Sequence, residues 1–153
     1  MRIRLATAAD IPVIMALEKH AAAAAHWSAG QYENALSGEA PSRVVLIVEG
    51  EAGEDEAGVL GFIAGRALSD EWEVENIAVA GPTRRRGLGT LLLGEFLDLA
   101  QSRGAARVFL EVRESNLAAR RLYEKCAFVE SGRRKLYYRE PEEDAIVYQI
   151  GFS

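Results

Sequence analysis

The spacing of apolar positions predicts strands and helices that follow one another through the whole chain. Alternating or continuous apolar runs predict strands at 2–5, 44–48, 59–68, 72–79, 107–112, 127–135 and 144–150. Apolar residues three and four positions apart predict helices at 7–20, 28–36, 88–104 and 116–125. Thr7 and Asp10 stand at the spacing of a capping box, and the Ser28 hydroxyl can cap the second helix. This order predicts an α/β (α+β) fold, with a mixed sheet of about six or seven strands and helices on both faces.

The strand expected at 72–79 is polar at its start and apolar at its end. Strict alternation places on one face of this strand Glu73, Glu75, Ile77 and Val79. It places on the other face Trp72, Val74, Asn76 and Ala78. The two ends of the strand are therefore expected to face different surroundings.

The composition is that of one globular domain spanning residues 1–153, because 49% of the residues are apolar and 27% are charged. The net charge of −5 argues against a dedicated nucleic-acid binder. Residues 1–76 hold 5 basic and 13 acidic side chains, whereas residues 77–153 hold 13 basic and 10 acidic ones. This asymmetry suits two ligands of opposite charge, or simply two solvated faces.

The single cysteine, Cys126, excludes a disulfide framework and a cysteine-rich zinc site, and no metal is expected. The N-terminal residues include Asp10 and Glu18 and lack the basic start and apolar run of a signal peptide. No stretch approaches the roughly 18 uninterrupted apolar residues that a membrane span needs. The sequence therefore predicts a soluble, cytoplasmic protein with no membrane partner.

Residues 77–90 combine a strand, a turn and the start of a helix, and this segment predicts a site for a pyrophosphate. The first backbone N–H groups of a helix and its dipole favour an anion. Gly87 and Gly89 would let the backbone approach the anion, and Arg84 to Arg86 add positive charge. A Walker loop is excluded because the segment has no lysine, and a dinucleotide fingerprint because position 92 is leucine. A basic turn with a glycine at the helix start is the structural alternative.

Two further residues could carry proton transfer. Glu111 falls inside a strand between Leu110 and Val112, where an apolar residue is expected. Such a carboxylate is either ion-paired or a proton acceptor in a partly dry cleft. Tyr123 lies one position off the apolar face of its helix, so its hydroxyl could reach the same cleft or simply pack.

Two spaced motifs together resemble the GNAT superfamily of acyl-CoA-dependent N-acetyltransferases. The first is Arg84-x-x-Gly87-x-Gly89 after Ile77-Ala78-Val79, and the second is Asn116-x-x-Ala119-x-x-Leu122-Tyr123-x-x-x-Ala127-Phe128. The resemblance covers residues 2–151. Within the superfamily the chain is similar to the RimI type, which acetylates the N-terminal alanine of a small-subunit ribosomal protein. The supporting stretches are His26-Trp27-Ser28 with Gln31-Tyr32, Leu110-Glu111-Val112-Arg113, and Tyr137-Tyr138 with Glu143-Asp144-Ala145-Ile146.

The resemblance implies acetyl-CoA as co-substrate and assigns its contacts to residues of this chain. Strand-like backbone hydrogen bonds to the pantetheine arm would come from Ile77, Ala78 and Val79. The pyrophosphate would lie on Arg84, Arg85, Arg86, Gly87, Leu88, Gly89 and Thr90. Asn116 would bond the coenzyme near its thiol. Glu111 matches the family's general base and Tyr123 its general acid.

The same resemblance describes the acceptor side. Trp27 is expected to form a wall of the peptide groove, and Tyr137 and Tyr138 to line it, although all three could instead pack. Glu75 is the rival general base, because relatives in the wider superfamily often carry the base on this strand. Glu73 and Glu75 could also attract a positively charged amino terminus, or be exposed charges at a strand edge.

The residue types suit direct acetyl transfer, in which the amine attacks the thioester and no enzyme nucleophile is needed. A carboxylate can accept the ammonium proton, directly or through a water, and a phenol can donate to the leaving thiolate. A backbone N–H near Val79 could polarise the thioester carbonyl. Ala127 departs from the family pattern, which has glycine there, and its methyl group is disfavoured if φ is positive.

The sequence thus predicts an N-acetyltransferase that acetylates the α-amine of a protein N-terminus, favouring the N-terminal alanine of a ribosomal protein. A small-amine or lysine side-chain acetyltransferase would use the same coenzyme site with a different groove. A non-catalytic acyl-CoA-binding module is a third alternative, which predicts coenzyme binding without thiol release.

Overall fold

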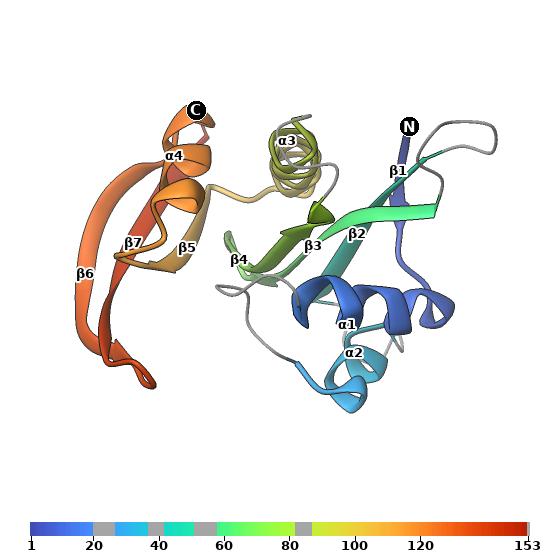
Figure 1. The fold of residues 1–153 in the computed structure, drawn as a ribbon. Coiled ribbons are helices and arrows are strands. Elements are labelled where there is room, and N and C mark those ends of the chain that lie inside the picture. Colours follow the sequence, from blue (N-terminus) through green and yellow to red (C-terminus); the bar gives the residue numbers. More distant parts are fainter. Residues whose placement is uncertain (20–26, 37–41, 51–57, 82–86, 153) are drawn as a thin grey trace.

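The computed structural model describes residues 1–19, 27–36, 42–50, 58–81 and 87–152 (Figure 1). Its strands are β1 (Arg2–Leu5), β2 (Arg43–Gly50), β3 (Gly58–Leu68), β4 (Glu71–Val79), β5 (Arg107–Arg113), β6 (Val129–Tyr138) and β7 (Glu143–Gly151). Its helices are a short 3-10 turn (Ala8–Asp10), α1 (Ile11–Lys19), α2 (Ala29–Leu36), α3 (Leu88–Ser102) and α4 (Leu117–Lys125). Each strand and helix that the apolar spacing predicts is present, so the predicted α/β fold is confirmed.

All seven strands form one sheet in the order β1-β2-β3-β4-β5-β7-β6. Neighbouring strands are antiparallel except β4 and β5, which run parallel. Parallel neighbours require a crossover connection, and α3 provides it between these two strands. The sheet is therefore mixed, with two antiparallel parts that meet at the β4–β5 pair.

Helices cover both faces of this sheet, and each face has its own apolar core (Figure 1). On one face α3 and α4 contribute Phe96 and Tyr123 to the larger core. On the other face α1 and α2 contribute Ile14 and Tyr32 to a smaller core. The predicted arrangement of helices on both faces is confirmed.

Both predicted helix caps are present. The Thr7 backbone N–H donates to the Asp10 carboxylate at 2.7 Å, which closes the expected capping box. At the start of α2 the Gln31 N–H donates to the Ser28 hydroxyl at 3.2 Å, and the Ser28 N–H donates to the Gln31 side chain at 2.7 Å. These bonds satisfy backbone donors that a helix start leaves without an intrahelical acceptor.

The predicted alternation along β4 is wrong at its centre, because the strand contains a bulge. Gly65 of β3 pairs with Val74 and Ala64 pairs with Asn76, so Glu75 is an extra residue in β4. The inserted residue reverses the faces that follow it. Trp72 and Val74 pack in the larger core, and Ile77 and Val79 pack against that same core rather than sharing a face with Glu73. Ala78 packs in the smaller core.

Candidate active site

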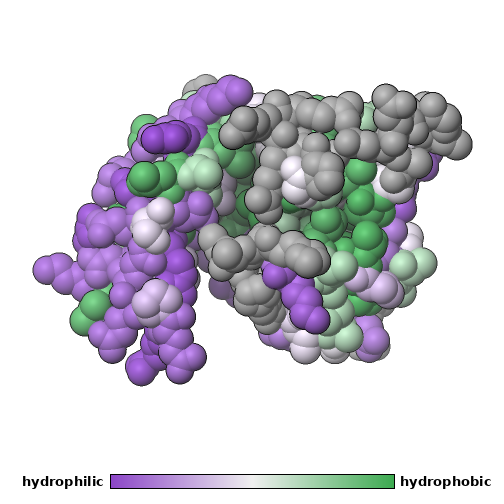
Figure 2. Space-filling model, viewed as in Figure 1, coloured by the Kyte–Doolittle hydropathy of each residue, from purple (hydrophilic) through white to green (hydrophobic). Residues whose placement is uncertain are grey.

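The sheet opens between β4 and β5. These strands pair from Glu71 with Arg107 to Val74 with Leu110, and their pairing ends there. β4 still pairs with β3 as far as Val79, and β5 with β7 as far as Arg113. The two strands therefore diverge, and the space-filling view is notched between the β6–β7 part and the rest of the molecule (Figure 2).

Two residues of β4 direct their backbone groups toward this opening. The Ala80 N–H donates to the Leu60 carbonyl of β3 at 2.8 Å. Successive residues of a strand direct their backbone N–H and C=O groups to alternate sides of the strand. The backbone groups of Ala78 therefore also point to β3, whereas those of Ile77 and Val79 point toward β5. The expected backbone contacts to a pantetheine arm can therefore come from Ile77 and Val79, and Ala78 directs its backbone groups away from the opening.

The start of α3 can receive an anion. Gly87 precedes the helix with φ of 76°, a left-handed conformation that side-chain-bearing residues rarely adopt. A Cβ there would meet no atom of the described residues within 4 Å. The first turn of the helix, from Leu88, contains no acidic residue. Backbone N–H groups and the helix dipole therefore favour a phosphate at this end. The candidate residues Arg84, Arg85 and Arg86 lie outside the described residues.

Gly89 has a packing role at the same place. A Cβ on Gly89 would lie 3.2 Å from Cδ2 of Leu122, so glycine allows the first turn of α3 to lie close against α4. Thr90 also contacts α4, through a hydrogen bond with the Cys126 thiol. The two candidate coenzyme residues thus help to join the helix that would bind the pyrophosphate to the helix that carries Tyr123.

Glu111 lies on the face of β5 opposite Leu110 and Val112, which are buried in the larger core. Its side chain is 13% exposed, and its Oε1 is 3.2 Å from Nε of Arg134. The Tyr137 hydroxyl is hydrogen bonded to the same carboxylate, and this raises the pKa of Tyr137. The carboxylate thus faces an arginine and a phenol, both from β6, at the opening of the sheet.

Tyr123 lies in the larger core, on the opposite face of the sheet from Glu111. Its ring is buried between Phe128 and Tyr148, with ring centroids 6.0 and 6.2 Å away. Its hydroxyl makes no hydrogen bond with the rest of the described chain. Burial raises the pKa of Tyr123 above its ordinary value, so the phenol stays protonated at neutral pH.

The end of α4 fixes the position of Tyr123. The Phe128 N–H donates to the Tyr123 carbonyl at 3.0 Å, and the Ala127 N–H donates to the Glu124 carbonyl at 3.1 Å. These two bonds form a Schellman motif, and the contact between the Phe128 and Tyr123 rings completes it. Ala127 has φ of 72°, so the alanine that departs from the family pattern does occupy a left-handed position.

Tyr138 is electrostatically coupled to both candidate proton-transfer groups. Burial, and then the charge of Glu111, raises the pKa of Tyr138 to about 12, and Tyr138 in turn raises the pKa of Tyr123. The Arg113 guanidinium lies 4.4 Å from the centre of the Tyr138 ring. Arg113 also donates to the carbonyl of Pro141 at 3.1 Å, which joins β5 to the β6–β7 turn.

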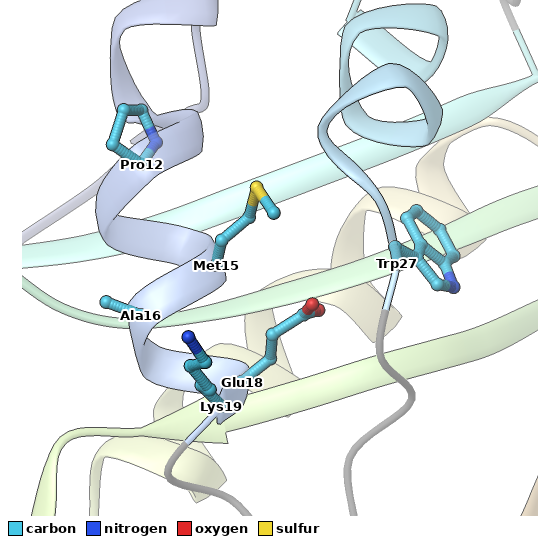
Figure 3. Close-up of a pocket in the computed structure, with 6 residues that line it drawn as sticks. All are labelled: Pro12, Met15, Ala16, Glu18, Lys19 and Trp27. Atoms are coloured by element: carbon cyan, nitrogen blue, oxygen red, sulfur yellow. The ribbon is translucent and has the colours of Figure 1, made fainter.

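The remaining candidate residues have mixed surroundings. Asn116 is the N-cap of α4, since its Oδ1 accepts the Ala119 N–H at 3.2 Å, which leaves its amide nitrogen for a coenzyme contact. Trp27 lines an open pocket beside α1 (Figure 3). Tyr137 is 49% exposed on β6, as a residue that lines a channel can be.

Glu73 and Glu75 are not the exposed edge charges that the sequence allowed, because each side chain is only 16% exposed. Glu75 Oε1 lies 2.7 Å from Nη1 of Arg43, and Glu73 Oε1 lies 2.8 Å from Nε of Arg66. Burial nevertheless raises the pKa of Glu75. Glu75 therefore remains a rival proton acceptor, held by an arginine.

Sequence reasoning missed the arginines that pair with these acids, Arg43, Arg66 and Arg134. Their partners lie on other strands, so only strand order and register bring them together. It also missed Gly65, although a glycine inside a predicted strand is a signal of a bulge. A Cβ on Gly65 would lie 2.3 Å from the Glu73 carbonyl oxygen, and glycine is therefore required beside the bulge.

A comparison with protein families matches residues 14–128, most of the chain, to the acetyltransferase (GNAT) family. The chain belongs to this family. The mixed seven-stranded sheet with helices on both faces is thus the fold of a GNAT domain. Within the described residues, no cluster of potential ligands could hold a metal ion, and no helix is long and apolar enough to cross a membrane.

Two ribosomal-protein N-acetyltransferases are similar to this GNAT domain in sequence or in structure. A [Ribosomal protein bS18]-alanine N-acetyltransferase of Salmonella typhimurium is 40% identical over 94 residues, which are 60% of this chain and 64% of that relative. The chain thus matches just under two thirds of that relative's length. The crystal structure of the Escherichia coli ribosomal-protein-S18-alanine N-acetyltransferase matches with a TM-score of 0.81 and 30% identity, over 99% of this chain and 94% of that one.

A third structure shares the fold. It is a putative acetyltransferase from Salmonella typhimurium, solved with its cofactor acetyl-CoA. It matches with a TM-score of 0.81 and 20% identity, over all of this chain and 94% of that one.

Proposed function

We propose that this protein transfers the acetyl group of acetyl-CoA to the α-amine of a protein N-terminus, and that its acceptor is the N-terminal alanine of a small-subunit ribosomal protein. The opening of the sheet carries the proposal, because it has Glu111 on one face and Tyr123 on the other. The names of the relatives from Salmonella and Escherichia coli support the acceptor.

The described residues fit the coenzyme. A pyrophosphate can bind at the start of α3, where a Cβ on Gly87 would meet none of the described atoms within 4 Å and the first turn contains no acidic residue. The amides of the pantetheine chain can form hydrogen bonds with the backbone groups of Ile77 and Val79, which face the opening. Acetyl-CoA supplies the acetyl group as a thioester, whose carbonyl a backbone N–H of Val79 can polarise.

Glu111 is the proposed proton acceptor. The acceptor's ammonium must lose a proton before its nitrogen can form a bond to the acetyl carbon, and a carboxylate at the opening can take that proton directly or through a water. In the free protein Arg134 and Tyr137 hold this carboxylate in place. Glu75 is the alternative acceptor, on the neighbouring strand.

Tyr123 is the proposed partner of the leaving sulfur. When the C–S bond breaks, the thiolate needs a proton or a hydrogen bond. Because burial raises the pKa of Tyr123, this phenol holds its proton more firmly than a thiol of pKa about 8.5 does. We therefore assign to Tyr123 the donation of a hydrogen bond to the thiolate, which is protonated finally by solvent.

Coenzyme-thiol release from acetyl-CoA tests the proposed function with three acceptors. These are a short peptide with a free N-terminal alanine, the same peptide blocked at its N-terminus and carrying an internal lysine, and a polyamine. The proposal predicts release with the alanine peptide alone. Thiol release with only the lysine peptide or the polyamine would show that the acceptor is a side-chain or small amine and not a protein N-terminus. If acetyl-CoA binds but no acceptor gives thiol release, the result would favour a non-catalytic binding module.

A further inference from the structure

A closed chain of contacts surrounds the bulge of β4 on the face that α1 and α2 cover. We call it the bulge ring, and its members are Glu75, Arg43, Trp27, Tyr32, Glu18 and Asn76. Glu75 and Asn76 are neighbours in β4, Arg43 comes from β2, and Glu18 and Tyr32 come from α1 and α2. Trp27 precedes α2. The ring thus joins both helices to the strand at the opening.

One half of the ring is made of charge and aromatic contacts. The bulged residue Glu75 pairs with Arg43 at 2.7 Å. The Arg43 guanidinium lies 5.3 Å from the centre of the Trp27 ring, a cation–π distance. The Trp27 ring lies 5.1 Å from the Tyr32 ring. The orientation of Trp27 therefore depends on Arg43 at one side and Tyr32 at the other.

The other half is a buried hydrogen-bond network. The Tyr32 hydroxyl donates to Oε2 of Glu18, and Nδ2 of Asn76 donates to the same oxygen at 3.1 Å. These three side chains are 0%, 3% and 4% exposed for Tyr32, Glu18 and Asn76. Burial and the neighbouring carboxylate raise the pKa of Tyr32, so it remains a donor.

Burial of the Glu18 carboxyl group lowers the stability of the fold, so this residue is expected to have a structural or functional role. None of the lysines and arginines that the structure describes forms an ion pair with Glu18, and burial of its carboxyl group costs hydration energy. An apolar residue at this position would pack without that loss. The network does, however, fix the spacing between α1, α2 and β4, because hydrogen bonds are directional and apolar contacts are not.

The ring extends from a surface pocket to the opening of the sheet. Glu18 and Trp27 line the open pocket beside α1, and the Glu18 carboxylate lies between Met15 and Trp27 in the close-up view (Figure 3). On the side of the ring away from this pocket, Glu75 lies in β4, just after the point where the pairing of β4 with β5 ends. The coenzyme's expected contacts at the start of α3 are on the opposite face of the sheet.

We infer that Tyr32 and Glu18 are positioning residues for the acceptor, which hold Trp27 and the bulge of β4 in the geometry that receives it. The inference rests on the proposed function and adds that the acceptor approaches from the face covered by α1 and α2. It predicts a specific kinetic effect. Substitutions that break the hydrogen-bond network should raise KM for the acceptor and leave KM for acetyl-CoA unchanged.

The first test is Tyr32→Phe, which removes the hydroxyl and retains the ring. We expect KM for the acceptor to rise on the order of 10-fold, below the roughly 100-fold that a 1 Å misplacement can cost. KM for acetyl-CoA is expected to stay at the wild-type value. Glu18→Gln is the conservative rescue, because one amide oxygen can accept both hydrogen bonds that Oε2 accepts. It should therefore keep a near-wild-type acceptor KM.

Two further variants separate positioning from stability. Ile14→Val is the matched control, since Ile14 is fully buried in the same core on α1 and is not in the ring. It should lower the melting temperature and leave both KM values unchanged. Arg43→Met breaks the other half of the ring at a residue whose side chain is 28% exposed, so it should fold and raise acceptor KM even if Tyr32→Phe does not fold.

The inference is overturned if Tyr32→Phe and Arg43→Met leave acceptor KM unchanged, or if they raise it no more than Ile14→Val does at an equal loss of melting temperature. It is also overturned if KM for acetyl-CoA rises in parallel. If the wild-type protein acetylates lysine rather than the alanine peptide, the proposed function fails by itself. The same KM comparison with the lysine acceptor then still decides the role of the ring.

Discussion

Ala127→Gly should stabilise this protein, although most substitutions destabilise a fold. Ala127 follows α4 with φ of 72°, where the Cβ of an L-residue costs about 1–2 kcal/mol. Glycine removes that cost but gives the unfolded chain extra freedom, worth about 0.4–1 kcal/mol. The Ala127 side chain is exposed and its N–H already donates to the Glu124 carbonyl, so no packing or hydrogen bond is lost.

The net effect is a stabilisation of about 0.5–1 kcal/mol, which corresponds to a rise in melting temperature of roughly 1–4 °C for a domain of this size. Thermal and urea unfolding followed by circular dichroism would measure it. Ala118→Gly is the matched control, because Ala118 is an exposed alanine within the same helix. There the change relieves no left-handed strain and should destabilise, by at most about 1 kcal/mol. Equal losses in both variants would refute the strain at Ala127 and with it the reasoning from the Schellman motif.

The remaining predictions concern activity, packing and acid stability. Glu111→Gln should lower kcat by about 100-fold or more and leave acetyl-CoA binding intact; if Glu75→Gln alone does this in steady-state assays, Glu75 is the base. Gly65→Ala should cost more than about 2 kcal/mol in urea unfolding, because its Cβ would lie 2.3 Å from a backbone oxygen; an unchanged midpoint would contradict the bulge geometry. The Arg4 guanidinium lowers the pKa of Asp10, so the carboxylate stabilises the fold fully above its ordinary value of 3.8 and loses that contribution as the pH falls through its lower folded pKa. Arg4→Met should therefore be less stable at neutral pH and lose less stability on acidification, as melting curves across the acidic range would show.

Periodicity was sufficient for the elements of this fold, because strands and helices with one buried face repeat their apolar residues at two different periods. Periodicity predicted the wrong face or the wrong boundary where a bulge or a helix cap interrupts the regular alternation of a strand. The bulge at Glu75 reverses the faces of β4, and its cause is the pairing of Gly65 on another strand. The strand predicted at 127–135 is β6, which begins instead at Val129, since Ala127 and Phe128 close the Schellman motif of α4.

The candidate site was predictable where its chemistry is local in sequence. The glycine before α3 and the positions of Glu111 and Tyr123 could be named from motifs and spacing. Their partners could not, because Arg134 meets Glu111 only through the register of β6, β7 and β5. The network of Glu18, Tyr32 and Asn76 likewise joins α1 and α2 to β4, and Asn76 is 58 residues from Glu18 in the chain.

A competition between two amines within one peptide tests whether the protein acetylates an α-amine. The peptide carries a free N-terminal alanine and an internal lysine, and mass spectrometry locates the acetyl group after reaction with acetyl-CoA. The proposed function predicts acetylation at the α-amine of the alanine, with the lysine unmodified and the reaction strongly slowed in Glu111→Gln. Acetylation of the lysine in preference to the α-amine would contradict it.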